Sequence, residues 1–421
     1  MEEVFEQGKT AAQIRAEKET RIMDAIHLKK TDRVPIICGM GYFPAKYAGI
    51  PSSAAYYDFD TWLDAYRKTL RVYQADMIYH QPFTPGKALE ILDPKQLRWP
   101  GHGVDPYKGH QSIEVENLQG DEYDAYMNDT ADYMLRVHMS RVSTKLAGLA
   151  KLPRLKDLGN GSMGAQMMAM ALSDKDVALA IRTLQQTGRE MRKWAGRQAK
   201  FNQMMLDVGF PQYFQGGAGP PFDLISHSLR GMAGTMLDMF RQPNQVIKAC
   251  EFILENELAR PMAKPNVYGN TRIFMTNTRG SCDFMSDKQF DKFYWPTFKK
   301  LVLTLIERGG TPCIFFEGNF TSRLEYLLQF PKGKILARLD TTDIKKAKEV
   351  LRGHVCIQGN VPSSLLQAGT VQQVRDYCKD LIDTIGADGG FILSPRSSTD
   401  EVNPVNLKAM IDFTHEYGVY K

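Results

Sequence analysis

The chain has 421 residues, of which 43% are hydrophobic and 24% charged, as is ordinary for a globular protein with a sizeable core. The formal net charge of +5 is small and is not gathered in a long block, which argues against a nucleic-acid-binding protein. No stretch approaches the roughly 20 apolar residues of a membrane helix, and the charged start lacks the apolar core of a signal peptide. Six scattered cysteines without a CxxC pair favour free thiols in a reducing cytoplasm.

Eight short apolar or β-branched segments, each bounded by turn residues, are predicted to be strands. In chain order they are 34–38 (VPIIC), 76–80 (DMIYH), 213–217 (YFQGG), 272–276 (RIFMT), 313–317 (CIFFE), 334–340 (KILARLD), 355–360 (VCIQGN) and 390–395 (GFILSP). Segments with helical spacing follow most of them, at 60–74, 243–258, 287–307, 342–351, 370–385 and 404–417. This alternation indicates a parallel sheet covered by helices. We therefore predict an α/β fold, a (β/α)₈ TIM barrel formed by residues 1–421 as one domain, with an N-terminal helical extension.

Residues 81–200 interrupt the alternation with turn signals and short helices. We predict that this region is an insertion after the second strand that caps the barrel mouth as a lid. A small separate domain is the alternative, although no linker rich in Pro, Gly or Ser marks a boundary. Within the region, the methionines of MGAQMMAMAL are expected to fill core space, and the basic stretch 189–200 is expected to be a solvated helix face.

In barrels of this kind the active site lies at the carboxyl ends of the strands. The residues at or just after the predicted strand ends form a strongly polar set: Cys38, Tyr42, His80, Gln215, Asn277, Glu317, Asn319, Asp340, Asn360 and Arg396. Asp223 follows the glycine-rich stretch GGAGPP and is either a pocket acid or the cap of the next helix. We predict Glu317, His80 and Asp340 as catalytic, and the other residues as substrate-binding.

Glu317 has the strongest claim to a catalytic role. The residues before it are apolar, so the carboxyl is expected beside a low-dielectric wall that keeps it partly protonated. That environment suits a general acid, or equally a metal ligand shared with His80 or Asp340. The alternative is a purely structural role for Glu317, in a salt bridge to Arg323 or Arg338 at the rim. For Asp340 the alternative is a turn beside a helix capped by Thr342 or Asp343.

Several segments together resemble the uroporphyrinogen decarboxylase superfamily. They are KTDRVPI at 30–36, the glycine-rich stretch and helix at 216–243, residues 339–382 and residues 389–413. The resemblance implies a (β/α)₈ barrel with its site at the carboxyl-terminal mouth, but it leaves the reaction open because the superfamily includes more than one chemistry.

Two branches of that superfamily fit poorly. Decarboxylases of the tetrapyrrole pathway carry Arg-Gln-Ala-Gly-Arg-Tyr after the first strand, whereas residues 38–49 read CGMGYFPAKYAG and supply no arginine for substrate carboxylates. Thiol-methylating relatives bind zinc through His-x-Cys and a later Cys. Here Phe315 and Glu317 stand at the first two positions and Ser397 at the third, so that zinc–thiolate site is absent as written.

The remaining resemblance is to methyltransferase I of O-demethylase systems. It implies a cobalamin-dependent methyltransferase that moves a methyl group from a methoxylated aromatic compound to the Co(I) of a separate corrinoid protein. The corrinoid is expected on that partner because this chain lacks the Asp-x-His-x-x-Gly motif. Zinc and a homodimer stay open. The alternatives are a decarboxylase or lyase acting on another carboxylated substrate, which should gather arginines such as Arg279 or Arg396, and a non-catalytic ligand-binding protein.

Overall fold

The computed structural model describes residues 8–79 and 84–420 of the chain. All eight predicted strands are confirmed: β1 (Ile37–Gly39), β2 (Met77–Tyr79), β6 (Gly216–Gly217), β7 (Arg272–Asn277), β8 (Thr311–Phe316), β9 (Leu336–Leu339), β10 (Cys356–Val361) and β11 (Phe391–Pro395). Strands β6 to β11 pair in parallel in chain order, and β1 pairs in parallel with β2. A parallel bridge between Ile36 and Leu393 places β1 beside β11. The order is that of a (β/α)₈ barrel, with a seam between β2 and β6, which form no ladder among the described residues.

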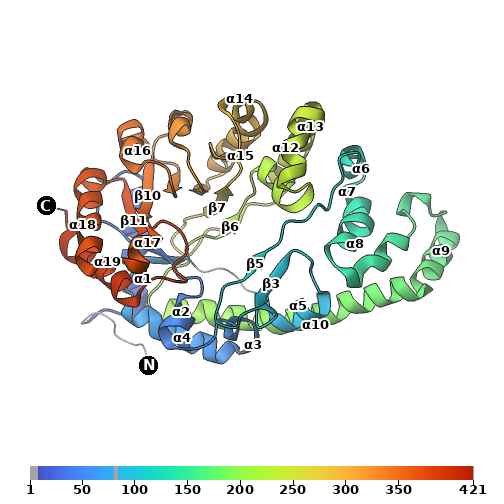
Figure 1. Ribbon diagram of the computed structural model, residues 1–421, viewed down its shortest axis with the longest axis horizontal. Helices are drawn as coiled ribbons and strands as arrows, with labels where there is room; N and C mark the ends of the chain where they lie inside the picture. Colours follow the sequence, from blue (N-terminus) through green and yellow to red (C-terminus); the bar gives the residue numbers. More distant parts are fainter. Residues whose placement is uncertain (1–7, 80–83, 421) are drawn as a thin grey trace.

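Helices follow the strands and cover the outer face of the sheet (Figure 1). They are α2 (Phe43–Ala48), α3 (Ala54–Tyr57), α4 (Phe59–Val72), α11 (Pro221–Leu224), α12 (Met232–Arg241), α13 (Pro243–Ala259), α14 (Asp287–Gln289), α15 (Trp295–Glu307), α16 (Ile344–Leu351), α17 (Ser363–Ala368), α18 (Val371–Leu381) and α19 (Pro404–Tyr417). Asp343 caps α16 by accepting hydrogen bonds from the backbone of Lys345 and Lys346, as one of the two predicted caps. None of the helices in residues 8–79 and 84–420 has the length and apolar run needed to cross a membrane.

The region between β2 and β6 holds the predicted insertion. Its elements are α5 (Gly86–Leu92), β3 (Leu97–Pro100), β4 (Gly103–Val104), β5 (Gln111–Ser112), α6 (Tyr123–Asn128), α7 (Thr130–Asp132), α8 (Met139–Val142), α9 (Gly161–Ser173) and α10 (Lys175–Asp207). Residues 97–116 reach the loops at the carboxyl ends of the strands: the ring of His110 contacts Tyr42, and Glu116 pairs with Arg230 just before α12. This part of the insertion therefore borders the mouth, and its mobility as a lid stays a prediction.

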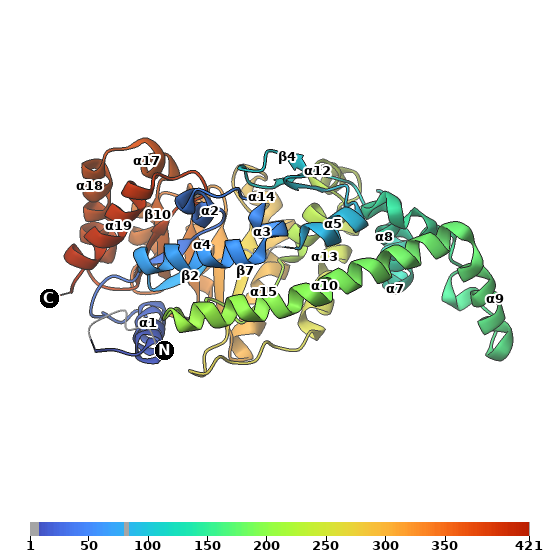
Figure 2. The same ribbon diagram turned by 90° about the horizontal axis from the view of Figure 1, so that it is seen from below.

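Helix α9 projects from the body at the far end of the long helix α10 (Figure 2). It contains no charged residue. Three of its four methionines, Met163, Met167 and Met170, are 65%, 43% and 76% exposed, so the expectation that they fill a core is wrong for these three. Met168 packs against a small core cluster that includes Leu149. The reason is geometric: the helix lies at the tip of an arm, where only Gly164 is buried. The basic face at 189–200 is mostly exposed, as predicted.

The N-terminal helix α1 (Ala11–Ile26) closes the amino-terminal end of the barrel. Its Ile22, Met23 and Ile26 pack against one inward-facing side chain from each of seven neighbouring segments: Ile37, Met77, Tyr213, Cys313, Leu336, Cys356 and Ile392. We call this layer the barrel floor. Beside it, the Arg272 guanidinium pairs twice with Glu19, with Nη1–Oε1 at 2.6 Å and Nη2–Oε2 at 3.0 Å, and both residues are buried. The helical extension is thus a structural part of the barrel.

Asp76 ties α1 and β1 to the start of β2. Its buried carboxylate accepts a hydrogen bond from the Ile36 backbone and pairs with Arg33 and Arg21, with nitrogen–oxygen distances of 2.6–2.8 Å. Burial alone would raise its pKa, but the two arginines and the backbone N–H outweigh burial and lower the pKa to about 2. The motif KTDRVPI supplies one of the two arginines.

Protonation of Asp76 is expected to destabilise the fold in acid. Its folded-state pKa of about 2 lies below the ordinary value of 3.8, so between these values the unfolded chain binds more protons. The stabilisation is therefore present above the ordinary pKa and is lost as pH falls through the folded one, by about 2–3 kcal/mol in all. Urea unfolding from about pH 5 to pH 2 should show this extra loss in the wild type but not in Asp76→Asn. Parallel pH curves for the two proteins would contradict the assignment.

Candidate active site

The inward positions above the floor form a second layer inside the barrel. Because side chains alternate along a strand, residues two positions beyond the floor also face inward. For the six floor residues at or beside the other strands these are Gly39, Tyr79, Phe315, Arg338, Gln358 and Ser394, whereas Tyr213 precedes β6. Tyr79 packs on Phe274 and Phe214 with ring centroids 5.4 and 5.8 Å apart, and Phe214 stacks on Phe274 at 5.1 Å. We call Tyr79, Phe214, Phe274 and Phe315 the aromatic layer.

Arg338 is the cation of this interior. Its guanidinium carbon lies 4.2 Å from the centre of the Phe315 ring, and its Nη2 donates to the carbonyl of Arg396 at 3.2 Å. Only 8% of the residue is exposed, and its Nε is buried without a hydrogen-bond partner. The sequence suggested Arg338 only as a rim partner for Glu317. The sequence did contain a sign of this position. Arg338 is the one cation in the middle of the apolar strand KILARLD, which could have indicated a side chain that faces the barrel interior.

Glu317 stands at the rim, directly after the last residue of β8. Its Oε2 accepts a hydrogen bond from the Thr278 hydroxyl at 2.9 Å, and its backbone N–H donates to the Asn277 carbonyl at 3.1 Å. The residue is exposed, so the expected burial against an apolar wall is not seen, because the strand ends one residue earlier. The alternative salt bridges are not seen either: Arg323 pairs with Asp287 and Arg338 binds a carbonyl.

Asp340 and Asn319 shape the loop that follows Glu317. Asp340 Oδ2 accepts a hydrogen bond from the Gly318 backbone at 3.0 Å. The side chain of Asn319 accepts one from the Thr321 backbone at 2.9 Å, at the start of the next helical turn. Gly318 has a φ of +92°, and an added Cβ would lie 2.7 Å from the Ser281 hydroxyl, so glycine is required there. Asp340 therefore positions the loop that carries Glu317.

Three predicted substrate ligands are engaged in the protein's own packing or hydrogen bonds. Cys38 is part of the core between sheet and helices, where burial raises the pKa of its thiol. Asn277 is fully buried and faces a small cavity lined by aromatic side chains such as Phe316. Asn360 donates to the Asp340 carbonyl at 3.1 Å and lies near the Tyr377 hydroxyl of α18. These positions argue against direct contact of the three side chains with a ligand inside the barrel.

Gln215 and Asp223 support the neighbouring strand end. Gln215 Oε1 accepts from the Arg272 backbone at 2.8 Å and thereby continues the sheet. Asp223 accepts from the Tyr294 hydroxyl at 2.6 Å and from the Arg279 and Thr278 backbones at 2.8 and 3.2 Å. Burial raises the pKa of Asp223 to about 6 although these hydrogen bonds oppose the rise. Asp223 holds the loop that carries Thr278; it does not cap a helix.

Tyr42 belongs to a polar group above β1 and β11. Its hydroxyl lies 2.8 Å from that of Tyr56 and 3.0 Å from Nδ1 of His110, and its backbone N–H donates to Asp400 at 2.6 Å. Burial raises the pKa of Tyr42 and lowers that of His110. Nearby, the backbone of Arg396 donates to Val361, and its buried Nε has no hydrogen-bond partner. The predicted catalytic residue His80 lies outside the described residues.

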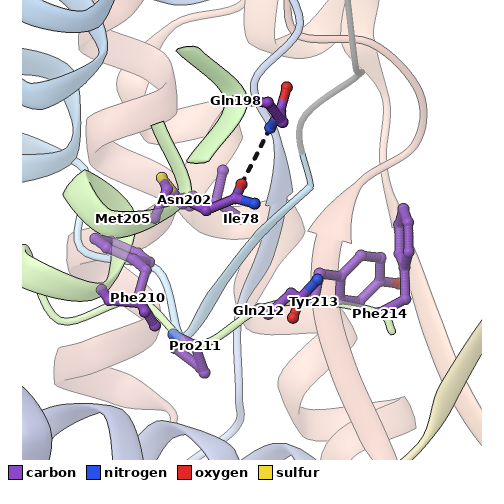
Figure 3. Close-up of a pocket in the computed structure, with 10 residues that line it drawn as sticks. Ile78, Gln198, Asn202, Met205, Phe210, Pro211, Gln212, Tyr213 and Phe214 are labelled. Carbon is purple, nitrogen blue, oxygen red and sulfur yellow. Dashed lines mark hydrogen bonds between the residues drawn. The ribbon is translucent and has the colours of Figure 1, made fainter. Parts of the chain in front are cut away.

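A separate pocket of about 310 Å³ opens beside the seam (Figure 3). It is lined by Ile78, by Gln198, Asn202, Met205 and Leu206 of α10, and by Phe210 to Phe214. Tyr213 and Phe214 also touch the inner face, because both rings pack on Tyr79. The pocket thus adjoins the aromatic layer.

Within residues 8–79 and 84–420, no group of three His, Cys, Asp or Glu side chains is arranged to hold a metal ion. Glu317 and Asp340 each accept a hydrogen bond from a neighbouring loop instead. The described donor set therefore does not fit the zinc site of the thiol-methylating relatives.

A family model described as uroporphyrinogen decarboxylase (URO-D) matches residues 212–417, from just before β6 through α19. This segment belongs to the URO-D superfamily. The URO-D segment supplies β6 to β11, and therefore Glu317, Arg338 and Asp340. The chain is also 36% identical over 77 residues to a uroporphyrinogen decarboxylase of Teredinibacter turnerae. That match covers 18% of this chain and spans only 22% of the length of the relative.

A solved structure extends the likeness to the whole fold. A methyltransferase from Methanosarcina mazei superposes with a TM-score of 0.57, over 95% of this chain and 98% of its own length. Sequence identity between the two is 15%, so the comparison establishes a shared fold. The URO-D segment and the N-terminal elements thus form one known arrangement of strands and helices.

Proposed function

We propose that this chain is a methyltransferase that removes the methyl group of a methoxylated, aromatic donor and passes it to the Co(I) of a separate corrinoid protein. The observation that carries the proposal is the aromatic layer inside the barrel, with one rim carboxyl, Glu317, beyond it. Stacked aromatic side chains suit an aromatic ring as ligand. The URO-D segment and the fold shared with a protein described as a methyltransferase support this reading.

The residues of this chain would act on the leaving oxygen. Breaking the methyl–oxygen bond leaves the electron pair on a phenolate, which departs more readily when it receives a proton. Glu317 would give that proton, and the Thr278 hydroxyl, 2.9 Å from its Oε2, would orient the carboxyl. The Co(I) of the partner would supply the nucleophile that takes the methyl group. A partner docked over the mouth would exclude water from Glu317 and from the leaving oxygen.

A second candidate is a decarboxylase or lyase that acts on a carboxylated substrate. The buried, unpaired Arg338 favours it, because such an enzyme needs a cation beside the substrate carboxylate. A non-catalytic binding protein gains no such support. The feature expected for it was Glu317 buried in a rim salt bridge, whereas Glu317 is exposed and bonded to a hydroxyl.

The test is an assay of the purified chain with a reduced corrinoid protein and a panel of methoxyarenes. We expect the absorbance of the methylated corrinoid to appear with at least one donor, together with the corresponding phenol. No methylation with any donor, accompanied by CO₂ release from an aromatic acid, would refute the methyltransferase and establish the second candidate.

A further inference from the structure

The charge of Arg338 has no counter-ion in the part of the chain that the structure describes. No carboxylate oxygen lies within 4.0 Å of its guanidinium there, and its Nη2 donates a hydrogen bond to a neutral carbonyl, that of Arg396. A guanidinium stays protonated in proteins, so this charge cannot be removed by losing a proton. Burying an unpaired charge is costly, and buried charges are normally paired. The interior is therefore built for a negative group that the protein itself does not supply.

The surroundings of Arg338 specify what carries that negative group. Its guanidinium carbon lies 4.2 Å from the centre of the Phe315 ring, and Phe315 belongs to the aromatic layer. The field of Arg338 also reaches Tyr79 across the interior: burial raises the pKa of that phenol, and the positive charge opposes the rise. A second donor-capable group, the buried Ser394 hydroxyl, faces the same interior without a partner. Cation, hydroxyl and aromatic rings thus share one space.

The two nearest carboxylates are committed elsewhere. Asp340 holds the Gly318 backbone, and Glu317 accepts from Thr278. Both favour the charged form of Arg338 from a distance, but neither pairs with it. A planar guanidinium binds a carboxylate through two parallel hydrogen bonds, which the free Nε and its neighbouring nitrogen allow.

We propose that Arg338 binds the carboxylate of an aromatic acid whose ring lies against the aromatic layer. The proposal deepens the proposed function and rests on it in one respect, namely that the acid is the methyl donor. In that case the donor is a methoxybenzoate-type compound, and neutral methoxyarenes are poor substrates. The second candidate function would use the same site for its own carboxylate.

Direct binding tests the proposal without any need for turnover. Isothermal titration of the wild type compares 4-methoxybenzoate with 4-methoxybenzamide, which has the same shape without the charge, and with inorganic phosphate. We expect the benzoate to bind at least about 10-fold more tightly than the amide, since hydrogen bonds to charged groups are the stronger ones. Equal binding of benzoate and amide would overturn the proposal. Phosphate bound as tightly as the benzoate would also overturn it, in favour of a plain anion site.

Two variants locate the site. Arg338→Met should weaken benzoate binding at least about 10-fold, to the level of the amide, while amide binding stays nearly unchanged. The matched control is Arg279→Met, because Arg279 also stacks on a phenylalanine, Phe284, but lies on the loop after β7 and bonds Ser226. It should keep the benzoate preference. Loss of the preference in Arg279→Met alone would refute the assignment.

Stability separates a ligand-binding role from a structural one. Without ligand, Arg338→Met should melt at the same or a higher temperature, because it removes an unpaired buried charge. A clear drop in melting temperature with an intact benzoate preference would make Arg338 structural. Arg338→Lys provides a second variant that keeps the charge and should bind the benzoate with intermediate affinity. If this discrimination holds while no methyl transfer occurs with any donor, the carboxylate site stands and the proposed function fails.

Discussion

Glu317→Gln is expected to lower methyl transfer about 100-fold to 10,000-fold while donor affinity stays within about twofold. Glutamine keeps the size of the side chain and can still accept the Thr278 hydrogen bond at the rim, but it has no proton to give the leaving oxygen. Single-turnover rates of corrinoid methylation and titration of the donor measure the two quantities separately. A loss in rate without a loss in affinity is the signature of an interaction made only in the transition state.

Glu325→Gln provides the control for this experiment. Glu325 is an exposed glutamate on the helical turn that follows the same strand, so the substitution has the same chemistry at a position away from the rim. It should leave both quantities unchanged. Wild-type turnover of Glu317→Gln would reassign Glu317 to a role in holding the β7 loop through Thr278.

Glu19→Gln should destabilise the protein by about 3–5 kcal/mol. The change leaves the Arg272 guanidinium charged and buried beneath the barrel without a carboxylate partner. The backbone carbonyls of Tyr213 and Gln212 and the sulfur of Met23 remain as acceptors. Urea unfolding at pH 7 measures the loss. Since this pair joins α1 to β7, the loss also measures how firmly the floor is attached.

The matched control lies on the same helix. Glu17 pairs with Lys9 at 2.8 Å, but its side chain is 44% exposed, so Glu17→Gln should change stability by no more than about 0.5 kcal/mol. Similar losses in the two variants would show that the helix as a whole, and not the buried pair, carries the effect.

The elements of this fold could be predicted because each has a local signature. The strand segments are short, apolar and bounded by turn residues, and the helix at 371–381 starts at Thr370 with a capping box. The direction in which strand residues face could not be predicted. Strands of a parallel sheet are apolar on both faces, so Cys38 and Asn277 gave no sign that they point away from the interior.

Only part of the candidate site could be predicted, namely the position of its residues along the strands and not their contacts. Glu317 and Asp340 lie at the rim, as their positions after β8 and β9 require, whereas their hydrogen-bond partners come from distant segments and leave no trace in the local sequence. Arg338 was missed because a cation inside a buried strand reads as a rim salt bridge. The burial of Arg338 indicates a ligand site only because its Nε has no hydrogen-bond partner. Whether a partner is present depends on the side chains of all the neighbouring strands, which the local sequence does not show.

The methionine-rich helix α9 has a chemical consequence of its own. Thioether sulfur is oxidised to the sulfoxide where oxidants can reach it, and the change turns an apolar side chain into a polar one. Met163 and Met170 are open to solvent, whereas Met40 and Met77 inside the body are fully buried. We therefore expect methionine oxidation to begin on α9 and to reach the buried methionines of the barrel later. The sulfoxide content of α9 should thus be an early measure of oxidative damage in a stored preparation.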